Sequence, residues 1–281
     1  MSERRVRILQ ISDTHICPPG VLAYGKVDTA DALARMVAHV SALEEDCGAI
    51  DAIVVSGDVA EDGSAAAYRA FRALTAPLRD RLFLLPGNHD TRDGMRAAFV
   101  ETTHLPPGPG PMDWAARVGS MRLIGLDTTV PGAPHGMLSH DQLVWLETEL
   151  LTEALPTLVF MHHPPFDTGI GHMDVQRLRN GDALIDLAAR HPCVLLLACG
   201  HVHRSILCAQ QGVSMAIAPA PAHAVALCHA PGAEPAFRLE PGAALLHVWE
   251  PVAEDPLGRL TSSVSFIDVH PGPFPFFGYA D

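Results

Sequence analysis

The chain has 281 residues, of which 48% are hydrophobic and 18% are charged, and its formal net charge at pH 7 is −13. This length and apolar content support a large buried core, which excludes an intrinsically disordered chain. The acidic balance argues against nucleic-acid polymers and anionic membrane surfaces as partners, because both attract basic proteins. No apolar run approaches the roughly 18 to 20 residues of a membrane span, and no signal-peptide core follows Met1, so we expect a cytoplasmic protein.

Short aliphatic runs predict buried strands along the first 200 residues, since each is too short for a helix and several are bounded by glycine or proline. These runs lie at 6–11, 52–55, 82–85, 122–126, 158–161 and 194–198.

Segments with helical spacing lie between these strands. The first carries apolar residues on one face, with Asp28 or Thr29 available as its N-cap: Leu33, Met36, Val37, Val40 and Leu43. The second begins with a capping-box pattern at Ser139 and Gln142 and stops before Pro156. Strands that alternate with helices predict an α/β fold whose sheet is covered by helices.

The pattern changes after Gly212, where proline and glycine crowd the connections. Runs at 213–217, 243–248 and 264–269 predict strands without long helices between them. We expect these strands to form a second, mixed or antiparallel sheet within a single domain that covers residues 1–281.

The cysteines of this chain give no sign of a functional site, whereas its many histidines indicate one. The six cysteines show no C-x-x-C pair, and most have apolar neighbours, which indicates buried reduced thiols: Cys17, Cys47, Cys193, Cys199, Cys208 and Cys228. The sixteen histidines exceed what an average chain of this length carries, and histidine is the commonest metal ligand. The positions of the histidines therefore guide the search for a site.

Almost every predicted strand is followed by a side chain that can bind a hard or borderline metal ion. The residues concerned are Asp13, His15, Asp58, Asn88, His89, His162, His163, His201 and His203. In an open α/β sheet, ligands bind beyond the carboxyl ends of the strands, so loops far apart in the chain can converge there. We expect one site made from five loops.

Seven of these side chains suffice for two divalent cations: Asp13, His15, Asp58, Asn88, His162, His201 and His203. Nitrogen and oxygen ligands without a thiolate suit iron, manganese, zinc or cobalt. Two such ions, roughly 3.5–4 Å apart, can hold phosphate oxygens, acidify a bound water and stabilise a pentavalent transition state. The cations would also supply the positive charge that this acidic protein otherwise lacks, so we expect a phosphate ester as substrate.

In order along the chain, these motifs resemble those of the calcineurin-like metallophosphoesterases. The matching segments are Asp13-Thr-His15, Gly57-Asp58, Gly87-Asn-His-Asp90, His162-His163 and Gly200-His-Val-His203. Further segments resemble the class III phosphodiesterase branch, in particular its bacterial glycerophosphodiesterases and cyclic-nucleotide phosphodiesterases: Leu22-Ala-Tyr-Gly25, Met161-His-His-Pro-Pro165, Met173-Asp174 and Gly272-Pro-Phe. This similarity spans nearly the whole chain.

The resemblance implies a four-layer α-β-β-α sandwich with two packed mixed sheets. It also implies a division of the ligands. Asp13, His15 and His203 would hold the first metal; Asn88, His162 and His201 would hold the second; Asp58 would bridge both. His89 would contact the phosphate and protonate the departing alkoxide, with Asp90 as its supporting partner.

The activity implied is in-line attack by a metal-bound hydroxide on a small organic phosphodiester, giving a phosphomonoester and an alcohol. Glycerophosphodiesters are the first substrate class to test. A 3′,5′- or 2′,3′-cyclic-nucleotide phosphodiesterase is the nearest alternative, although three Trp and three Tyr offer few surfaces on which a nucleobase could stack. A protein phosphatase and a noncatalytic scaffold of the same fold are weaker alternatives.

Other residues receive narrower expectations. Tyr24 and His172 lie in loops that could reach the substrate, together with Asn88 and His89. His163 either orients the neighbouring ligands or faces the other side of its strand. We expect Asp127 to brace a loop and Trp145 to pack in the core.

The end of the chain is rich in phenylalanine. Phe274, Phe276 and Phe277 would be costly to expose to water, so they either fold back onto the core or form a subunit contact. We therefore expect residues from about 250 to 281 to form a C-terminal extension that contributes to a homo-oligomer.

Overall fold

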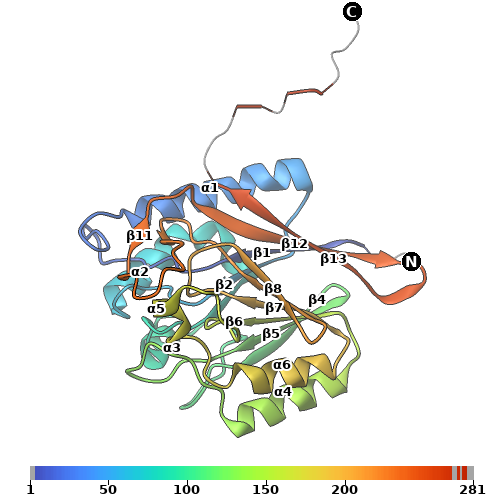
Figure 1. Cartoon of the computed structure of the whole chain (residues 1–281). Coiled ribbons are helices and arrows are strands. Elements are labelled where there is room, and N and C mark those ends of the chain that lie inside the picture. Colours follow the sequence, from blue (N-terminus) through green and yellow to red (C-terminus); the bar gives the residue numbers. More distant parts are fainter. Residues whose placement is uncertain (1–3, 268–270, 273, 277–281) are drawn as a thin grey trace, which may run out of the picture.

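The computed structural model describes residues 4–267, 271–272 and 274–276. Two multistranded sheets lie face to face, and helices cover their outer faces (Figure 1). The expected four-layer α-β-β-α sandwich with two mixed sheets is confirmed. Within the described part of the chain, no helix is both long enough and apolar enough to cross a bilayer.

The first sheet has the strand order β13-β12-β1-β2-β3. Its strands are β1 (Val6–Ile11), β2 (Ala52–Ser56), β3 (Leu82–Leu85), β12 (Ala243–Val252) and β13 (Asp255–Phe266). The strands β1, β2 and β3 run parallel, whereas β12 and β13 extend the sheet as an antiparallel hairpin. The carboxyl ends of the three parallel strands therefore share one edge.

The second sheet has the order β4-β5-β6-β7-β9-β8. Its strands are β4 (Trp114–Val118), β5 (Met121–Leu126), β6 (Thr157–Met161), β7 (Val194–Cys199), β8 (Ile206–Gln210) and β9 (Val213–Ile217). The four central strands are parallel, and β4 and β8 pair antiparallel at the two edges. A short ribbon of β10 (Ala224–Val225) and β11 (Phe237–Arg238) follows. The sequence patterns did not predict β4, β8, β10 or β11, which are edge or two-residue strands with many exposed side chains.

The expectation that the late strands form a sheet of their own is wrong. β9 joins the second sheet in parallel with β7, and β12 and β13 join the first sheet beside β1. The physical reason is that most of β12 is buried, so it must lie between two other strands instead of starting a separate sheet. The strand expected at 264–269 spans Asp255–Phe266, and residues 268 and 269 lie outside the described residues.

Helices complete the outer layers. The bounds are α1 (Thr29–Cys47), α2 (Ala65–Leu74), the 3-10 helix η1 (Ala76–Arg81), α3 (Arg92–Ala98), α4 (His140–Thr152), α5 (Gly171–Asp174) and α6 (Gly181–Ala189). In Figure 1, α1 and α2 lie on the first sheet, and α4 and α6 lie on the second. Asp28 caps α1 by accepting from the Asp31 amide, and Ser139 and Gln142 form the predicted capping box of α4.

Side chains of the central strands alternate between two cores, as expected for a sheet buried on both faces. In β6, Leu158 and Phe160 pack toward the first sheet, whereas Val159 and Met161 pack toward α4 and α6. Trp145 of α4 is half-buried against this second core, as predicted.

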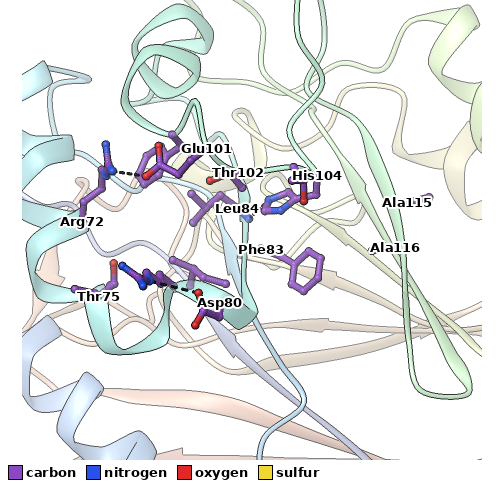
Figure 2. Close-up of a pocket in the computed structure, with 15 residues that line it drawn as sticks. Arg72, Thr75, Asp80, Phe83, Leu84, Glu101, Thr102, His104, Ala115 and Ala116 are labelled. Atoms are coloured by element: carbon purple, nitrogen blue, oxygen red, sulfur yellow. Dashed lines mark hydrogen bonds and ion pairs between the residues drawn. The ribbon is translucent and has the colours of Figure 1, made fainter.

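The edge strand β3 is closed by side chains instead of another strand. The Leu84 amide donates to His104 Nε2 at 3.0 Å, and the Leu84 carbonyl accepts from Trp114 Nε1 at 2.9 Å. A cavity of about 780 Å³ lies beside this edge (Figure 2). Its arginines are paired with acidic neighbours, and none of the expected metal ligands lines it.

The cysteines are free, with Cys17, Cys193 and Cys199 buried and Cys228 exposed. Near the end of the chain, Phe274 is 75% exposed and Phe276 is fully exposed, so neither folds back onto the core. Phe277 lies outside the described residues. The subunit contact remains a prediction.

Candidate metal centre

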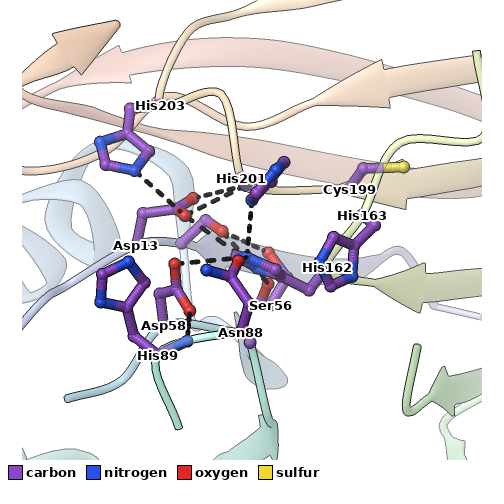
Figure 3. A network of polar contacts seen from close by, with 12 residues as sticks. Asp13, Ser56, Asp58, Asn88, His89, His162, His163, Cys199, His201 and His203 are labelled. Carbon is purple, nitrogen blue, oxygen red and sulfur yellow. Dashed lines mark hydrogen bonds and ion pairs between the residues drawn. The ribbon is translucent and has the colours of Figure 1, made fainter. Parts of the chain in front are cut away.

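The loops that follow β1, β2, β3, β6 and β7 meet at one end of the two sheets (Figure 3). Backbone hydrogen bonds join them: the amides of Asp13 and His15 donate to the carbonyls of Gly57 and Asp58, and the Gly200 amide donates to the His162 carbonyl. The Asp13 carboxylate accepts from the His201 amide at 3.0 Å, which links the two sheets. The structure thus brings together the five loops expected from the sequence.

The backbone at these loops is unusual. Five of the expected ligands have left-handed conformations, with φ of 55° at Asp13, 44° at His15, 48° at Asp58, 73° at His201 and 55° at His203. Such conformations cost of the order of 1–3 kcal/mol each for residues other than glycine, and they cluster at functional sites. The fold therefore tolerates strain here to direct these side chains inward.

The first group of expected ligands comprises Asp13, His15 and His203, all of them buried. His203 Nε2 lies 3.3 Å from Asp13 Oδ1 and 3.1 Å from His15 Nε2. The three ligand atoms therefore face a common point.

The second group comprises Asn88, His162 and His201. His162 Nε2 lies 3.0 Å from Asn88 Oδ1 and 3.2 Å from His201 Nδ1. Between the two groups, Asp58 Oδ2 lies 3.4 Å from His15 Nε2 and 3.3 Å from His162 Nε2. A single oxygen of Asp58 thus faces both groups.

This donor set fits divalent cations. Ligand atoms about 2.0–2.2 Å from one ion lie roughly 3 Å from each other, which matches the spacings above. Carboxylate oxygens, an amide oxygen and imidazole nitrogens also suit the first-row divalent metals. The four histidines would each offer one nitrogen to the cations.

The pKa values of the buried Asp and His side chains are also shifted by their mutual contacts. Burial opposes ionisation of Asp13 and Asp58, but His203 and His162 outweigh this effect and hold the pKa of both carboxyls below the ordinary value. Burial likewise opposes protonation of His162, yet the charge of Asp58 raises its pKa to about 9. Without cations, both carboxylates therefore stay ionised and His162 holds a proton, with which a cation would compete for that ring.

A cleft of about 360 Å³ opens above these residues. Its wall includes His15, Asp58, Asn88, His89, His201 and His203, together with Tyr24 and His172, the two loop residues expected to reach the substrate. No Lys or Arg is among the described residues that line the cleft. Positive charge for an anionic substrate would therefore have to come from bound cations.

His89 lies at the edge of the cleft with its ring 34% exposed. Its Nδ1 donates to the Glu61 carbonyl at 2.8 Å, so Nε2 is the atom free to meet a substrate. The expected partner, Asp90, accepts instead from Tyr68 and from the amides of Val59, Ala60 and Gly87, and its carboxylate ties the loops together. Glu61 thus takes the position that the sequence analysis gave to Asp90.

His163 lies behind the expected ligands and does not line the cleft. Its Nδ1 lies 2.8 Å from Thr128 Oγ1 and its Nε2 3.2 Å from the Pro134 carbonyl, so the ring is fixed. Its centroid lies 4.8 Å from those of His162 and His201, which fits an orienting role. Asp127 pairs with Arg92 and accepts from the Met112 and Thr129 amides, and so braces a loop as expected.

Sequence reasoning missed three residues. Glu61 accepts from His15 Nδ1 at 2.6 Å, and His223 and Phe237 line the cleft beside Tyr24. His223 could have been predicted from the sequence, because it follows β9, a parallel neighbour of β7. Ligands bind beyond the carboxyl ends of parallel strands, and this holds for β9 as well. Phe237 lies in the two-residue strand β11, for which no pattern existed.

Comparison with known proteins identifies the fold family. A family model described as calcineurin-like phosphoesterase matches residues 6–205. The chain belongs to the calcineurin-like phosphoesterase family. The match ends before β8, so the part of this phosphoesterase that carries His223 and Phe237 lies beyond the matched region.

Two curated relatives and one solved structure show which proteins this phosphoesterase is similar to. A protein of Arcobacter nitrofigilis, named probable glycerophosphodiester phosphodiesterase GpdQ, is 35% identical over 274 residues, which are 96% of each chain. The 3′,5′-cyclic adenosine monophosphate phosphodiesterase CpdA of Escherichia coli (strain K12) is 35% identical over 73% of this chain and 72% of its own. The crystal structure of a dimetal phosphatase from Danio rerio shares the fold, with a TM-score of 0.61 and 15% identity over 94% of this chain and 99% of the other.

Proposed function

We propose that this phosphoesterase hydrolyses small organic phosphodiesters, with glycerophosphodiesters as the first class, to a phosphomonoester and an alcohol. The carrying observation is the set of seven converging donors, five of which line a cleft that has no Lys or Arg among its described residues. The cleft volume of about 360 Å³ suits a small molecule. The name of the Arcobacter relative supports the diester class.

Two divalent cations, iron, manganese, zinc or cobalt, would be held by the residues described above. Asp13, His15 and His203 would hold the first, Asn88, His162 and His201 the second, and Asp58 both. Bound there, the cations would neutralise the phosphate oxygens and activate the water that attacks the phosphorus.

Side chains of the cleft would bind the substrate and donate a proton to the leaving group. Asn88 and His89 face the cleft beside Asp58, where the phosphate would lie. His89, held at Nδ1 by the Glu61 carbonyl, would donate the proton on Nε2 to the leaving oxygen. Tyr24 and His172 would contact the organic groups of the ester.

The direct test combines chelation with a substrate panel. Purified protein is stripped of metal and then assayed with glycerophosphodiesters, cyclic nucleotides, and aryl mono- and diesters, each with added manganese, cobalt, zinc or iron. We expect diester hydrolysis to return with metal and to exceed monoester hydrolysis. No restored turnover on any diester would favour the noncatalytic scaffold, and a preference for monoesters would reject the diesterase.

The role of His89 has its own prediction. His89→Ala should slow hydrolysis of alkyl diesters by about 10²–10⁴-fold, the usual contribution of a general acid. An activated aryl diester should be affected far less, because its leaving group needs little protonation. Metal content should stay at two ions per chain; equal losses on both substrates would contradict the role.

A second candidate, a cyclic-nucleotide phosphodiesterase, is favoured by one observation. Tyr24, His223 and Phe237 form an aromatic wall on the cleft, with ring centroids 5.0 Å apart for Tyr24 and Phe237 and 5.4 Å for His223 with either. Aromatic rings are suitable surfaces for a nucleobase. The CpdA relative is named for such a substrate.

Substitution of this wall separates the two candidates. If the alcohol group is a nucleoside, Phe237→Ala should raise KM for cyclic AMP by 10-fold or more while leaving a glycerophosphodiester almost unaffected. Leu151→Ala serves as the control, because it removes an exposed apolar side chain of α4 that does not line the cleft. Equal KM changes for both substrates would assign the wall a structural role.

Cytoplasmic location and a homo-oligomer remain predictions. Fractionation of the producing cells tests the first. Light scattering on the full chain and on a Phe274→Ser/Phe276→Ser variant tests the second, because the variant should dissociate if the exposed rings hold subunits together.

A further inference from the structure

Glu61 lies in the loop after β2, three residues beyond Asp58, and its carboxylate has no role in the proposed reaction, which uses only its backbone carbonyl. Its backbone is fixed against the loop that carries His15, because the Glu61 amide donates to the Ile16 carbonyl and the Ile16 amide donates to the Val59 carbonyl. Its side chain is 22% exposed and bends back toward the expected ligands. Glu61 Oε2 lies 2.6 Å from His15 Nδ1, a short contact between an imidazole and a carboxylate.

This contact determines which ring nitrogen of neutral His15 carries the proton. With Nδ1 donating to Glu61, the proton of the neutral ring is on Nδ1, and the lone pair is on Nε2. His15 Nε2 is the atom that lies 3.1 Å from His203 Nε2 and 3.4 Å from Asp58 Oδ2. The carboxylate thus fixes the tautomer in which His15 can accept a cation, and it makes the ring a stronger ligand.

The other three histidines lack this support. The outer nitrogen of His162, Nδ1, bonds to the neutral Ser56 carbonyl at 3.0 Å. His201 Nε2 and His203 Nδ1 are buried and have no hydrogen-bond partner among the described residues. Within the set, only His15 is hydrogen-bonded on its outer nitrogen to a carboxylate, so the two metal positions are supported unequally.

We propose that the Glu61 carboxylate is a positioning group that acts through His15 to strengthen the first metal position, held by Asp13, His15 and His203, relative to the second. The inference rests on the proposed function for the presence of cations but not for any turnover. Glu61 also holds His89 by its backbone carbonyl, which side-chain variants keep. Replacing the side chain keeps this bond but also removes a carboxylate oxygen that lies 3.9 Å from His89 Nδ1, so metal affinity is the direct readout.

The test measures metal binding directly, by calorimetric titration of metal-free protein with manganese, in Glu61→Ala and Glu61→Gln. We expect Glu61→Ala to weaken one of the two binding events by about 10- to 100-fold and to leave the other within about twofold. Glu61→Gln keeps an acceptor for His15 Nδ1 without the charge, so its loss should be smaller. Asp62→Asn, which removes an equal charge next in the chain without touching an expected ligand, should change neither event.

A double-mutant cycle assigns the effect to a position. In a His15→Ala background, Glu61→Ala should have no further effect on manganese affinity, because the ring through which it acts is gone. In an Asn88→Ala background, which cripples the second position, Glu61→Ala should still weaken the remaining event by its full factor. Additive losses with His15→Ala, or wild-type isotherms for Glu61→Ala, would overturn the proposal.

Two further measurements separate this role from a general structural one. The melting temperature of metal-free Glu61→Gln should stay close to the wild type, because its amide oxygen still accepts from the buried His15 Nδ1. If the diesterase assay succeeds, the manganese concentration for half-maximal rate should rise in Glu61→Ala. A lowered melting temperature with equal weakening of both events would contradict the proposal, and the binding arms remain decisive even if no substrate is found.

Discussion

At the scale of single residues, the candidate site depends on backbone conformations that most side chains avoid. Asp13, His15 and Asp58 adopt positive φ, and so do both histidines of the loop after β7. Beside them, Gly57 has φ of +101°, and a Cβ there would lie 2.3 Å from His162 Nδ1. Close approach of the backbone to an expected ligand thus requires glycine at this position.

We predict that Gly57→Ala damages the site more than the strain alone explains. The added methyl must displace His162, so unfolding free energy should fall by about 2–4 kcal/mol and manganese affinity should drop at least 10-fold. Gly110→Ala is the matched control, since Gly110 has φ of +107° with nothing near its Cβ. Denaturant titration and metal binding measure both effects, and equal outcomes for the two variants would reject the steric argument.

At the scale of elements, the strands that carry the site were predictable and the strands around them were not. Five strands are formed by aliphatic, largely buried segments: β1, β2, β3, β6 and β7. The approximate bounds of these segments and the polar residues that follow them could therefore be predicted from the sequence. Edge strands such as β8 alternate weakly because one side meets water. Which sheet β9 and β12 join depends on pairings between distant segments, which local pattern does not encode.

The hairpin of β12 and β13 carries a buried histidine that links stability to pH. His247 Nε2 lies 3.1 Å from Gln10 Oε1, and Nδ1 lies 2.7 Å from Ser262 Oγ. Burial lowers the pKa of His247 to about 4. Because the folded pKa lies below the unfolded value of about 6.5, the full stability is present above pH 6.5 and is lost as pH falls toward 4.

We therefore predict that His247→Gln reduces the pH dependence of stability. For the metal-free wild type, His247 should contribute a loss of about 1.5 kcal/mol in unfolding free energy between pH 6.5 and 5. Urea titrations at both pH values should show this difference shrinking in His247→Gln, whereas the exposed control His140→Gln should behave as the wild type. An unchanged difference in His247→Gln would show that other groups dominate.

At the scale of the whole molecule, the expected ligands come from both sheets. Asp13, Asp58 and Asn88 follow strands of the first sheet, whereas His162 and His201 follow strands of the second. Cations held among them would therefore connect the two halves of the sandwich. Binding to the folded state alone stabilises it by about 2.7 kcal/mol per site when the ion is at 100 times its Kd.

We expect manganese, added to metal-free protein, to raise the melting temperature by at least about 5 °C. Scanning calorimetry with and without the ion measures the shift. His203→Ala, which lacks one donor of the first group, should show a smaller shift. An identical melting temperature with and without manganese would mean that no cation binds preferentially to the folded chain.

The absence of Lys and Arg from the described lining of the cleft affects the order in which cations and substrate would bind. In an acidic protein of net charge −13, a cleft without Lys or Arg would bind esters of phosphoric acid weakly until cations are present. A phosphodiester substrate would then bind only after the cations and would not obstruct their entry. Loading would be ordered, ions first and ester second, and scarcity of transition metals in the cell would switch off recognition along with turnover.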